Sequence, residues 1–216
     1  MAEPRLLAEG RASEILDLGD GRVLRRFKTR GNAEREALVM RHARAHGFAV
    51  PDVYETGANS LVIEKIDGST MMEALLADVS TLDEQARTLA ALHEALHAIE
   101  APDGLSALGE GDRLLHLDLH PENVILSPSG PVVIDWTNAR RGPAALDVAV
   151  TWVLCATSDG AGLLGRDFAA SFLARFDDAE VLRALPAAAA YRLADENVLE
   201  EERAAIRALT LVAESS

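Results

Sequence analysis

Two aspartates and one asparagine around a short apolar hairpin are the residues of this chain best suited to chemistry. Asp118 and Asn123 precede the apolar run Val124–Leu126, and Asp135 follows a second run, Val132–Ile134. Each run is short, rich in β-branched residues and bounded by Pro, Gly or Asn, which predicts two strands joined as a hairpin. Such a hairpin would bring two carboxylates and one amide oxygen together. Oxygen ligands of this kind suit Mg²⁺, which takes one or two carboxylates with substrate phosphates. The spacing therefore predicts a phosphoryl-transfer site.

The segment His116-Leu-Asp118-Leu-His-Pro-Glu-Asn123 resembles the catalytic loop of protein kinases and, more closely, that of aminoglycoside phosphotransferases and related small-molecule kinases. Ile134-Asp135-Trp136 is similar to that second family's version of the metal-binding Asp-Phe-Gly. The resemblance implies that Asp118 is the catalytic base and that Asn123 and Asp135 hold Mg²⁺. The alternative is an Asx-rich hairpin whose side chains only cap turns.

The same resemblance implies an α+β, two-lobed, protein-kinase-like fold. Residues 1–66 would form a small N-lobe, an antiparallel β-sheet with one helix that covers the nucleotide. Residues 67–216 would form a mainly helical C-lobe with the catalytic loop, the metal site and the acceptor site. The hinge between the lobes would lie near residues 64–68.

Nucleotide-binding residues in the N-lobe also follow from the resemblance. The backbone around Glu64 and Ile66 would meet the adenine edge, and Ile63 would guard the pocket behind it. Arg25 stands where the family has a lysine on the α- and β-phosphates, and Glu36 would be its partner. Arginine keeps the charge but does not replace an ammonium group like for like. The alternative, without the resemblance, is that Arg25 is a solvated strand residue and that Glu36 only favours the start of a helix.

The first thirty residues predict a β-hairpin of residues 14–18 and 22–27 around an Asp-Gly turn. The two-residue period of a strand places Arg25 and Arg26 on opposite faces. Gly10 is the single glycine of a loop in which protein kinases have three. The glycine-rich loop over the phosphates is therefore reduced.

Helical periodicity covers much of the remaining chain. Residues 32–46, 70–99 and 142–154 each predict a helix, and residues 162–216 predict a helical region broken at Pro186.

The resemblance also implies that two further residues support the site. Asp147, near the start of the third predicted helix, would bind the backbone of the catalytic loop and hold Asp118 in position. His116 would pack against the segment around Asp135 without taking part in the chemistry.

A competing motif lies in the second predicted helix. His93-Glu-Ala-Leu-His97 matches the zinc-protease pattern of two histidines four residues apart. A zinc protease also needs a third ligand and an open cleft, and no later helical motif clearly supplies the ligand. Packed or surface histidines are therefore the preferred reading. Near the C-terminus, Asp195, Glu196 and Glu200–Glu202 form an acidic cluster, which predicts a solvated helix face. The alternative is that the cluster attracts amino groups of a substrate.

Composition narrows the class of protein. A hydrophobic content of 49% and a mean hydropathy of +0.05 allow a sizeable core, while no apolar run approaches the length of a membrane span. The N-terminus lacks a signal-peptide pattern, and the single Cys155, in an apolar context, fits a reducing cytoplasm. The net charge of −14 argues against a nucleic-acid partner. The expectation is a cytoplasmic protein with neither nucleic acid nor membrane as a partner.

The resemblance implies a kinase that transfers the γ-phosphoryl group of ATP or GTP to a hydroxyl of a small molecule, such as an aminoglycoside or another cationic metabolite. Protein substrates are disfavoured because no Ala-Pro-Glu follows Asp135 and the interval to Asp147 is too short for an activation segment. The alternative is a catalytically weak nucleotide-binding pseudokinase or sensor. The missing lysine and the reduced glycine loop motivate it.

Overall fold

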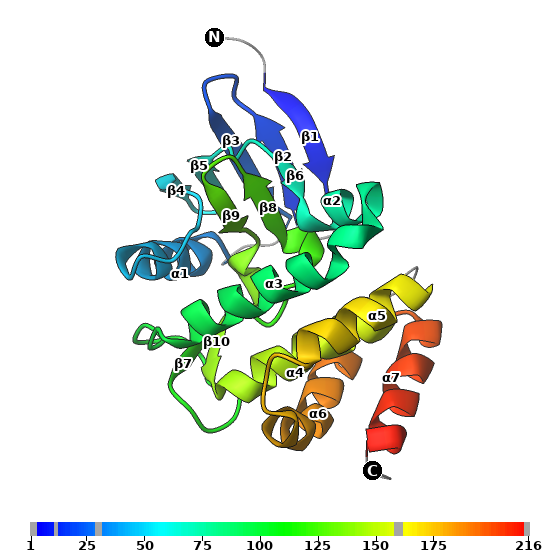
Figure 1. The fold of residues 1–216 in the computed structure, drawn as a ribbon. Helices are drawn as coiled ribbons and strands as arrows, with labels where there is room; N and C mark the ends of the chain where they lie inside the picture. Colours follow the sequence, from blue (N-terminus) through cyan, green and yellow to red (C-terminus); the bar gives the residue numbers. More distant parts are fainter. Residues whose placement is uncertain (1–3, 11–12, 29–31, 158–161, 214–216) are drawn as a thin grey trace.

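A five-stranded antiparallel sheet with one helix beside it forms the N-terminal part of the protein (Figure 1). The computed structural model describes residues 4–10, 13–28, 32–157 and 162–213. The sheet order is β1-β2-β3-β5-β4, and the helix α1 spans Asn32–Ala45. The strands are β1 Arg5–Glu9, β2 Ser13–Asp17, β3 Arg22–Phe27, β4 Val53–Gly57 and β5 Ser60–Glu64.

The predicted first hairpin is present as β2 and β3, with Ile15 opposite Arg25. Along β3, Val23, Arg25 and Phe27 are buried whereas Arg26 is exposed, as a regular strand with a period of two requires. Arg25 therefore points inward from the middle of the sheet.

Short strands connect the sheet to the helical part. β6 pairs with β8 and β8 with β9 in a three-stranded sheet, and β10 pairs with β7 in a two-stranded one. The strands are β6 Ser69–Thr70, β7 Arg113–Leu115, β8 Val124–Ser127, β9 Gly130–Val133 and β10 Arg140–Gly142, and the 3₁₀ turns are η1 Val79–Thr81, η2 Pro121–Asn123 and η3 Trp136–Asn138. The predicted hairpin is thus β8–β9, with Val124 opposite Val133.

Helices make up most of the rest of the chain, with α4 packed against α5 and α6 (Figure 1). They are α2 Met71–Ala77, α3 Leu82–His97, α4 Ala144–Thr157, α5 Gly162–Leu173, α6 Asp178–Leu193 and α7 Glu200–Ala213. The prediction of one helix over residues 70–99 was wrong. Asp78 ends α2 in an extended conformation, and its carboxylate caps the next turn by accepting the N–H of Ser80 at 3.0 Å. Asx residues compete with helical hydrogen bonds in this way.

The predicted break at Pro186 was also wrong, because α6 runs through it without interruption. A proline inside a helix removes one backbone hydrogen bond. The buried face of α6, which includes Val181, Leu185 and Ala188, packs against α4 and keeps the helix continuous. The breaks fall on either side, where Asp177 caps the start of α6 and Ala194 ends it.

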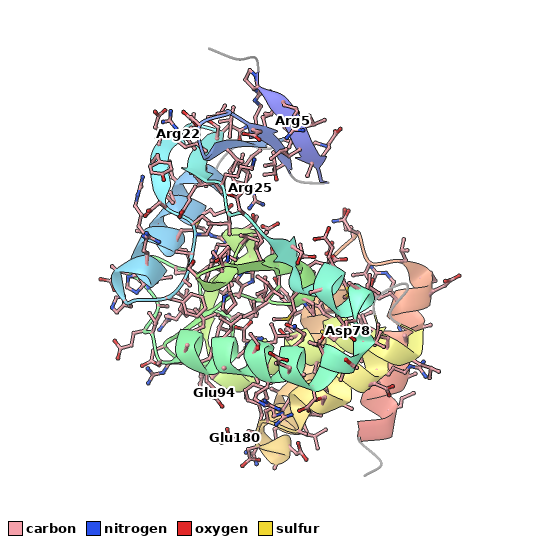
Figure 2. The ribbon with its side chains drawn as sticks, turned by 45° about the horizontal axis from the view of Figure 1, so that its top comes forward. Arg5, Arg22, Arg25, Asp78, Glu94 and Glu180 are labelled. Atoms are coloured by element: carbon pink, nitrogen blue, oxygen red, sulfur yellow. The ribbon has the colours of Figure 1, made fainter. Side chains whose placement is uncertain are left out.

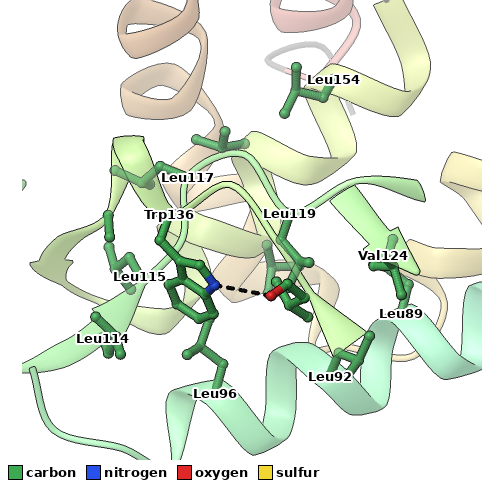
Figure 3. Packing of buried hydrophobic residues seen from close by; sticks show 14 of the residues in the cluster. Leu89, Leu92, Leu96, Leu114, Leu115, Leu117, Leu119, Val124, Trp136 and Leu154 are labelled. Carbon is green, nitrogen blue, oxygen red and sulfur yellow. Dashed lines mark hydrogen bonds between the residues drawn. The ribbon is translucent and has the colours of Figure 1, made fainter. Parts of the chain in front are cut away.

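Trp136 joins the two parts of the core. Its side chain is fully buried, and its Nε1 donates a hydrogen bond to the Val133 carbonyl at 3.1 Å (Figure 3). One edge-on contact reaches Phe48, just after α1, at 5.8 Å between ring centroids, and another reaches His116 at 4.6 Å. Leu96 of α3 and Leu114 and Leu115 of β7 lie beside the ring (Figure 3). This packing fixes the end of the β8–β9 hairpin.

The α+β architecture with an antiparallel N-terminal sheet and a helical C-terminal part confirms the predicted fold class. The division into lobes at residue 66 stays a prediction. Among the described residues, no helix has both the length and the apolar character needed to cross a membrane.

Candidate active site

The β8–β9 hairpin positions two of the three predicted polar residues. Asn123 ends η2 directly before β8, and its carbonyl accepts the N–H of Ile134 at 3.0 Å. Asp135 follows in the left-handed conformation, at φ 62°. The two side chains consequently lie at the same end of the hairpin and line one cavity.

A buried carboxylate shapes the loop that carries Asp118. Asp147 of α4 accepts the backbone N–H of His116 at 3.0 Å and that of Leu117 at 2.7 Å. Leu117 has φ 62°, which is strained for a leucine and persists only where the surroundings impose it. His97 also hydrogen-bonds to the Asp147 carboxylate at 2.9 Å. Asp147 thus determines the backbone conformation directly before Asp118.

His116 and Asn123 complete the support of this loop. His116 Nε2 lies 3.1 Å from the carbonyl of Ile134, so the ring donates there and links the loop to the hairpin. Asn123 Nδ2 donates to the backbone carbonyl of Asp118 at 2.8 Å. The Asp118 side chain remains 23% exposed, which leaves its carboxylate accessible from the adjoining cavities.

Arg25 lies at the centre of a second charged cluster. Its guanidinium donates to Glu36 and to Asp135, both at 2.7 Å, and to the hydroxyls of Ser13 and Thr137 at 3.2 and 3.1 Å. Only 7% of the Arg25 side chain is exposed, compared with 1% for Glu36 and 38% for Asp135. The pairing of Arg25 with Glu36 is therefore present, and the bridge from Arg25 to Asp135 is an addition that the sequence did not indicate.

The two buried carboxylates that support the site have opposite pKa shifts. Burial raises the pKa of Glu36 to about 7, although Arg25 opposes the shift. Burial acts in the same direction on Asp147, but hydrogen bonds and charge from His97 and His93 outweigh it and hold its pKa below the usual range. For Asp135, burial is likewise outweighed by the charge and hydrogen bond of Arg25, so its pKa lies below the ordinary value. Asp135 and Asp147 are therefore carboxylates at neutral pH.

Three cavities border these groups, and the second shares lining residues with each of the other two. The first, of about 330 Å³, lies between the sheet and the hairpin and is lined by every residue predicted to bind nucleotide: Arg25, Glu36, Ile63, Glu64 and Ile66. The second, of about 500 Å³, is lined by Arg25, Asp118, Asp135 and Thr137. The third, of about 440 Å³, lies beside α2, α4 and α5 and includes Asp118 and His120. Asp118 thus borders the second and third cavities, whereas Asp135 borders the first and second.

Sequence reasoning missed several residues of the site. The Thr137 hydroxyl accepts from Arg25 and lies 3.1 Å from Glu36 Oε2 and 2.9 Å from Asp135 Oδ1, so its single hydrogen can be donated to either carboxylate of the cluster. Arg35 donates to the carbonyls of Thr137 and Ala139 and so ties α1 to the segment after Asp135. The hydroxyl of Thr137, two residues after Asp135, was a local signal that could have been noticed. Tyr191 and Arg192, which line the second cavity from α6, gave none.

The donor set fits Mg²⁺. Asn123 donates its Nδ2 to a carbonyl, so its amide oxygen is the end available to a cation. The carboxylate of Asp135 engages Arg25 and Thr137 through Oδ1 and is partly exposed to the cavity that Asn123 also lines. A carboxylate and an amide oxygen that line the same cavity are ligand types that Mg²⁺ takes.

The histidines of the zinc-protease pattern have other partners in this fold. His93 is fully buried and lies 3.1 Å from the Thr151 hydroxyl, while His97 binds Asp147. The three side chains His93, His97 and Asp147 lie close enough to consider a metal ion, but both Asp147 oxygens already accept backbone N–H groups. Glu94, the general base of that pattern, is exposed on the outer side of α3 (Figure 2). The geometry therefore does not match a zinc protease.

The fold and this constellation define a protein-kinase-like phosphotransferase. A model of the phosphotransferase enzyme family matches residues 106–191, and a model of the RIO domain matches residues 19–143, more than half of the chain. The two matches overlap on the catalytic-type loop and the hairpin. Because the RIO domain model covers more than half of the chain, the chain belongs to the RIO domain family, and over residues 106–191 it is also similar to the phosphotransferase enzyme family.

Solved structures with similar folds are distant in sequence. Aminoglycoside phosphotransferase APH(4)-Ia in complex with AMP-PNP and hygromycin B has a TM-score of 0.74 at 15% identity, with 100% of this chain and 94% of that chain covered. A choline/ethanolamine kinase family protein from Mesorhizobium loti has a TM-score of 0.66 at 15% identity, with 99% and 87% covered. Thiamine kinase from Salmonella paratyphi B is 44% identical over 39 residues, 18% of this chain. That match spans 14% of the length of the thiamine kinase.

Proposed function

We propose that this protein transfers the γ-phosphoryl group of ATP or GTP to a hydroxyl group of a small molecule. The observation that carries the proposal is the position of Asp118 between the cavity with Arg25 and Asp135 and the cavity beside α2 and α5. A phosphoryl donor in the first and second cavities would thus meet an acceptor in the third next to a carboxylate. The neighbours in complex with AMP-PNP and with ATP support a nucleotide as the donor.

In this mechanism Asp118 orients the acceptor hydroxyl and takes its proton on a carboxylate oxygen. Asn123 and Asp147 hold the loop so that the carboxylate faces the acceptor. Positioning and electrostatic stabilisation provide most of the rate enhancement in phosphoryl transfer. Mg²⁺ held by Asn123 and Asp135 would neutralise charge on the phosphates.

The nucleotide would occupy the cavity of about 330 Å³ beneath the sheet. Glu64, at the end of β5, and Ile66, just after it, line this cavity, where their backbone would meet the adenine, and the buried Ile63 would lie behind it. Arg25 borders both this cavity and the second cavity. From there it can reach the nucleotide phosphates, as the family's lysine does.

The acceptor cavity has an apolar wall and an acidic rim. Carboxylates of Asp118 and Glu122 line it together with leucines, Phe168 and the ion pair of Arg192 with Glu202. This favours a cationic metabolite or an aminoglycoside with a free hydroxyl. Hygromycin B, streptomycin and thiamine are the small molecules named for the related proteins. We also propose a cytoplasmic location, because the single cysteine of the sequence, Cys155, is a free thiol, which fits a reducing compartment.

A nucleotide-binding sensor without turnover is the second candidate. It is favoured by the direct ion pair between Arg25 and Asp135, which occupies the carboxylate that would otherwise bind the metal alone. In that case nucleotide would bind and no phosphoryl group would be transferred.

The deciding experiment is a transfer assay with γ-labelled ATP and GTP against pooled metabolites and antibiotics that contain hydroxyl groups. We expect a labelled product with the wild-type protein and Mg²⁺, and its loss in Asp118→Asn. Nucleotide binding without transfer to any pool would support the sensor, and no nucleotide binding would refute both candidates.

A further inference from the structure

Two described residues, Asp118 and Arg192, line both the second cavity, of about 500 Å³, and the third, of about 440 Å³. The second is called the central cavity below, and the third the acceptor cavity. The central cavity also contains Arg25 and Asp135, which lie at its donor end. The carboxylate of Asp118 and the guanidinium of Arg192 therefore belong to the two residues that border both the donor end and the acceptor end of the proposed transfer. The first belongs to the catalytic-type loop, and the second comes from the last turn of α6.

Arg192 is held at this junction in an incompletely paired conformation. Its Nη2 donates to Glu202 of α7 at 2.9 Å, and its Nη1 lies 3.7 Å from Asp195. The side chain is 14% exposed, and its buried Nε has no hydrogen-bond partner among the described residues. An arginine fork binds a phosphate best through two parallel N–H groups, and the contacts with Glu202 and Asp195 do not satisfy all of its donors.

The charges around the transfer path call for a second cation. The described acidic residues of the central cavity are Asp118, Asp135 and Asp195, and its arginines are Arg25 and Arg192. Arg25 is committed to Glu36 and Asp135 at the donor end. Negative charge spreads over the oxygens of the transferred group, so a guanidinium opposite Asp118 would offset repulsion from that carboxylate.

We propose that Arg192 exchanges its contact with Glu202 for the phosphoryl group in transfer and acts as a catalytic residue at the acceptor end. Glu202 holds the guanidinium while the acceptor cavity is empty and releases it when the phosphoryl group arrives. The inference rests on the proposed phosphotransferase function and adds a residue from outside the catalytic-type loop and the hairpin.

The test compares binding of Mg-ADP with binding of Mg-ADP plus aluminium fluoride, which mimics the transferred group, by titration calorimetry. In the wild type we expect aluminium fluoride to increase the affinity for Mg-ADP. In Arg192→Gln this increase in affinity should be at least tenfold smaller, while the affinity for Mg-ADP alone stays unchanged. Arg183→Gln, an exposed arginine on the same helix, serves as the matched control and should keep the whole gain.

Two further variants separate phosphate binding from a structural ion pair. Glu202→Gln removes the resting partner and should leave the fluoride gain at or above that of the wild type, and Arg192→Lys should retain part of it. If Glu202→Gln loses the gain as Arg192→Gln does, or if Arg192→Gln keeps it, the inference is overturned. If Arg192→Gln does not fold, Glu202→Gln and Arg192→Lys decide. A wild-type protein that binds Mg-ADP without any fluoride gain refutes the phosphotransferase proposal itself.

Discussion

The two halves of the site are held by buried carboxylates that behave in opposite ways. On the acceptor side, both oxygens of Asp147 accept backbone N–H groups, and His97 binds one of them. On the donor side, Glu36 shares one arginine with Asp135, which is partly exposed. The pKa is lowered for Asp147 and raised to about 7 for Glu36. We therefore expect the first half to act as a fixed scaffold and the second to be a charge cluster whose partners change when phosphates bind.

The largest effect is expected on the acceptor side, at Asp118. Asp118→Asn should lower turnover about 10²- to 10⁴-fold, the typical contribution of a general base. Its nucleotide affinity should change far less, because Asp118 does not line the cavity beneath the sheet, where the adenine would lie, and borders only the second cavity, where the phosphates would lie. Steady-state kinetics and calorimetry with Mg-ATP measure the two quantities, and the exposed Asp112→Asn is the control. Wild-type turnover in Asp118→Asn would refute its role as base.

Asp147→Ala tests whether the acceptor half is a fixed scaffold. The substitution leaves two buried N–H groups and His97 without their acceptor, and loss of one partner from a buried charge network costs about 3–5 kcal/mol. Urea unfolding should show this loss of the free energy of unfolding. A change below about 0.5 kcal/mol, as is usual for surface substitutions, would mean that the loop keeps its shape without Asp147.

Arg25 and Arg26 provide a matched pair on the donor side. Arg25→Ala should weaken nucleotide binding at least about tenfold, a change of about 1.4 kcal/mol. Arg26→Ala removes only an exposed pair with Glu14, and such pairs contribute about 0–1 kcal/mol. Arg25→Lys should retain binding, since it restores the residue that the family has at this place. Equal affinities of the two alanine variants for nucleotide would show that β3 does not contact phosphate.

The smallest effect is a pH dependence that arises from Glu36. Because its pKa is higher in the folded protein than the usual value near 4.5, this group stabilises the fold at low pH. That contribution is lost as the pH rises from about 4.5 through about 7. Unfolding measured at several pH values should show Glu36→Gln without this loss, whereas the exposed Glu34→Gln should behave as the wild type. Identical pH profiles for wild type and Glu36→Gln would refute the shift.

The parts of the protein that local pattern determines were predictable. The β8–β9 hairpin and the positions of Asn123 and Asp135 follow from short apolar runs and turn residues, and the facing of Arg25 follows from strand periodicity. The continuity of α6 through Pro186 depends on packing against α4, which no local pattern records. The bond between Arg25 and Asp135 joins residues 110 positions apart. Contacts over such distances appear only once the chain is folded.

The strained conformation of Leu117 makes the order of folding matter. Its N–H and that of His116 find their acceptor only in Asp147, which is 30 and 31 residues further along the chain. During synthesis the loop around Asp118 therefore emerges before the residue that gives it its shape. Until α4 docks, nothing offsets the unfavourable energy of a positive φ at Leu117, so the stretch should adopt other conformations. A ribosome-bound chain that stops before residue 147 would have the acidic side chains of the site without their arrangement.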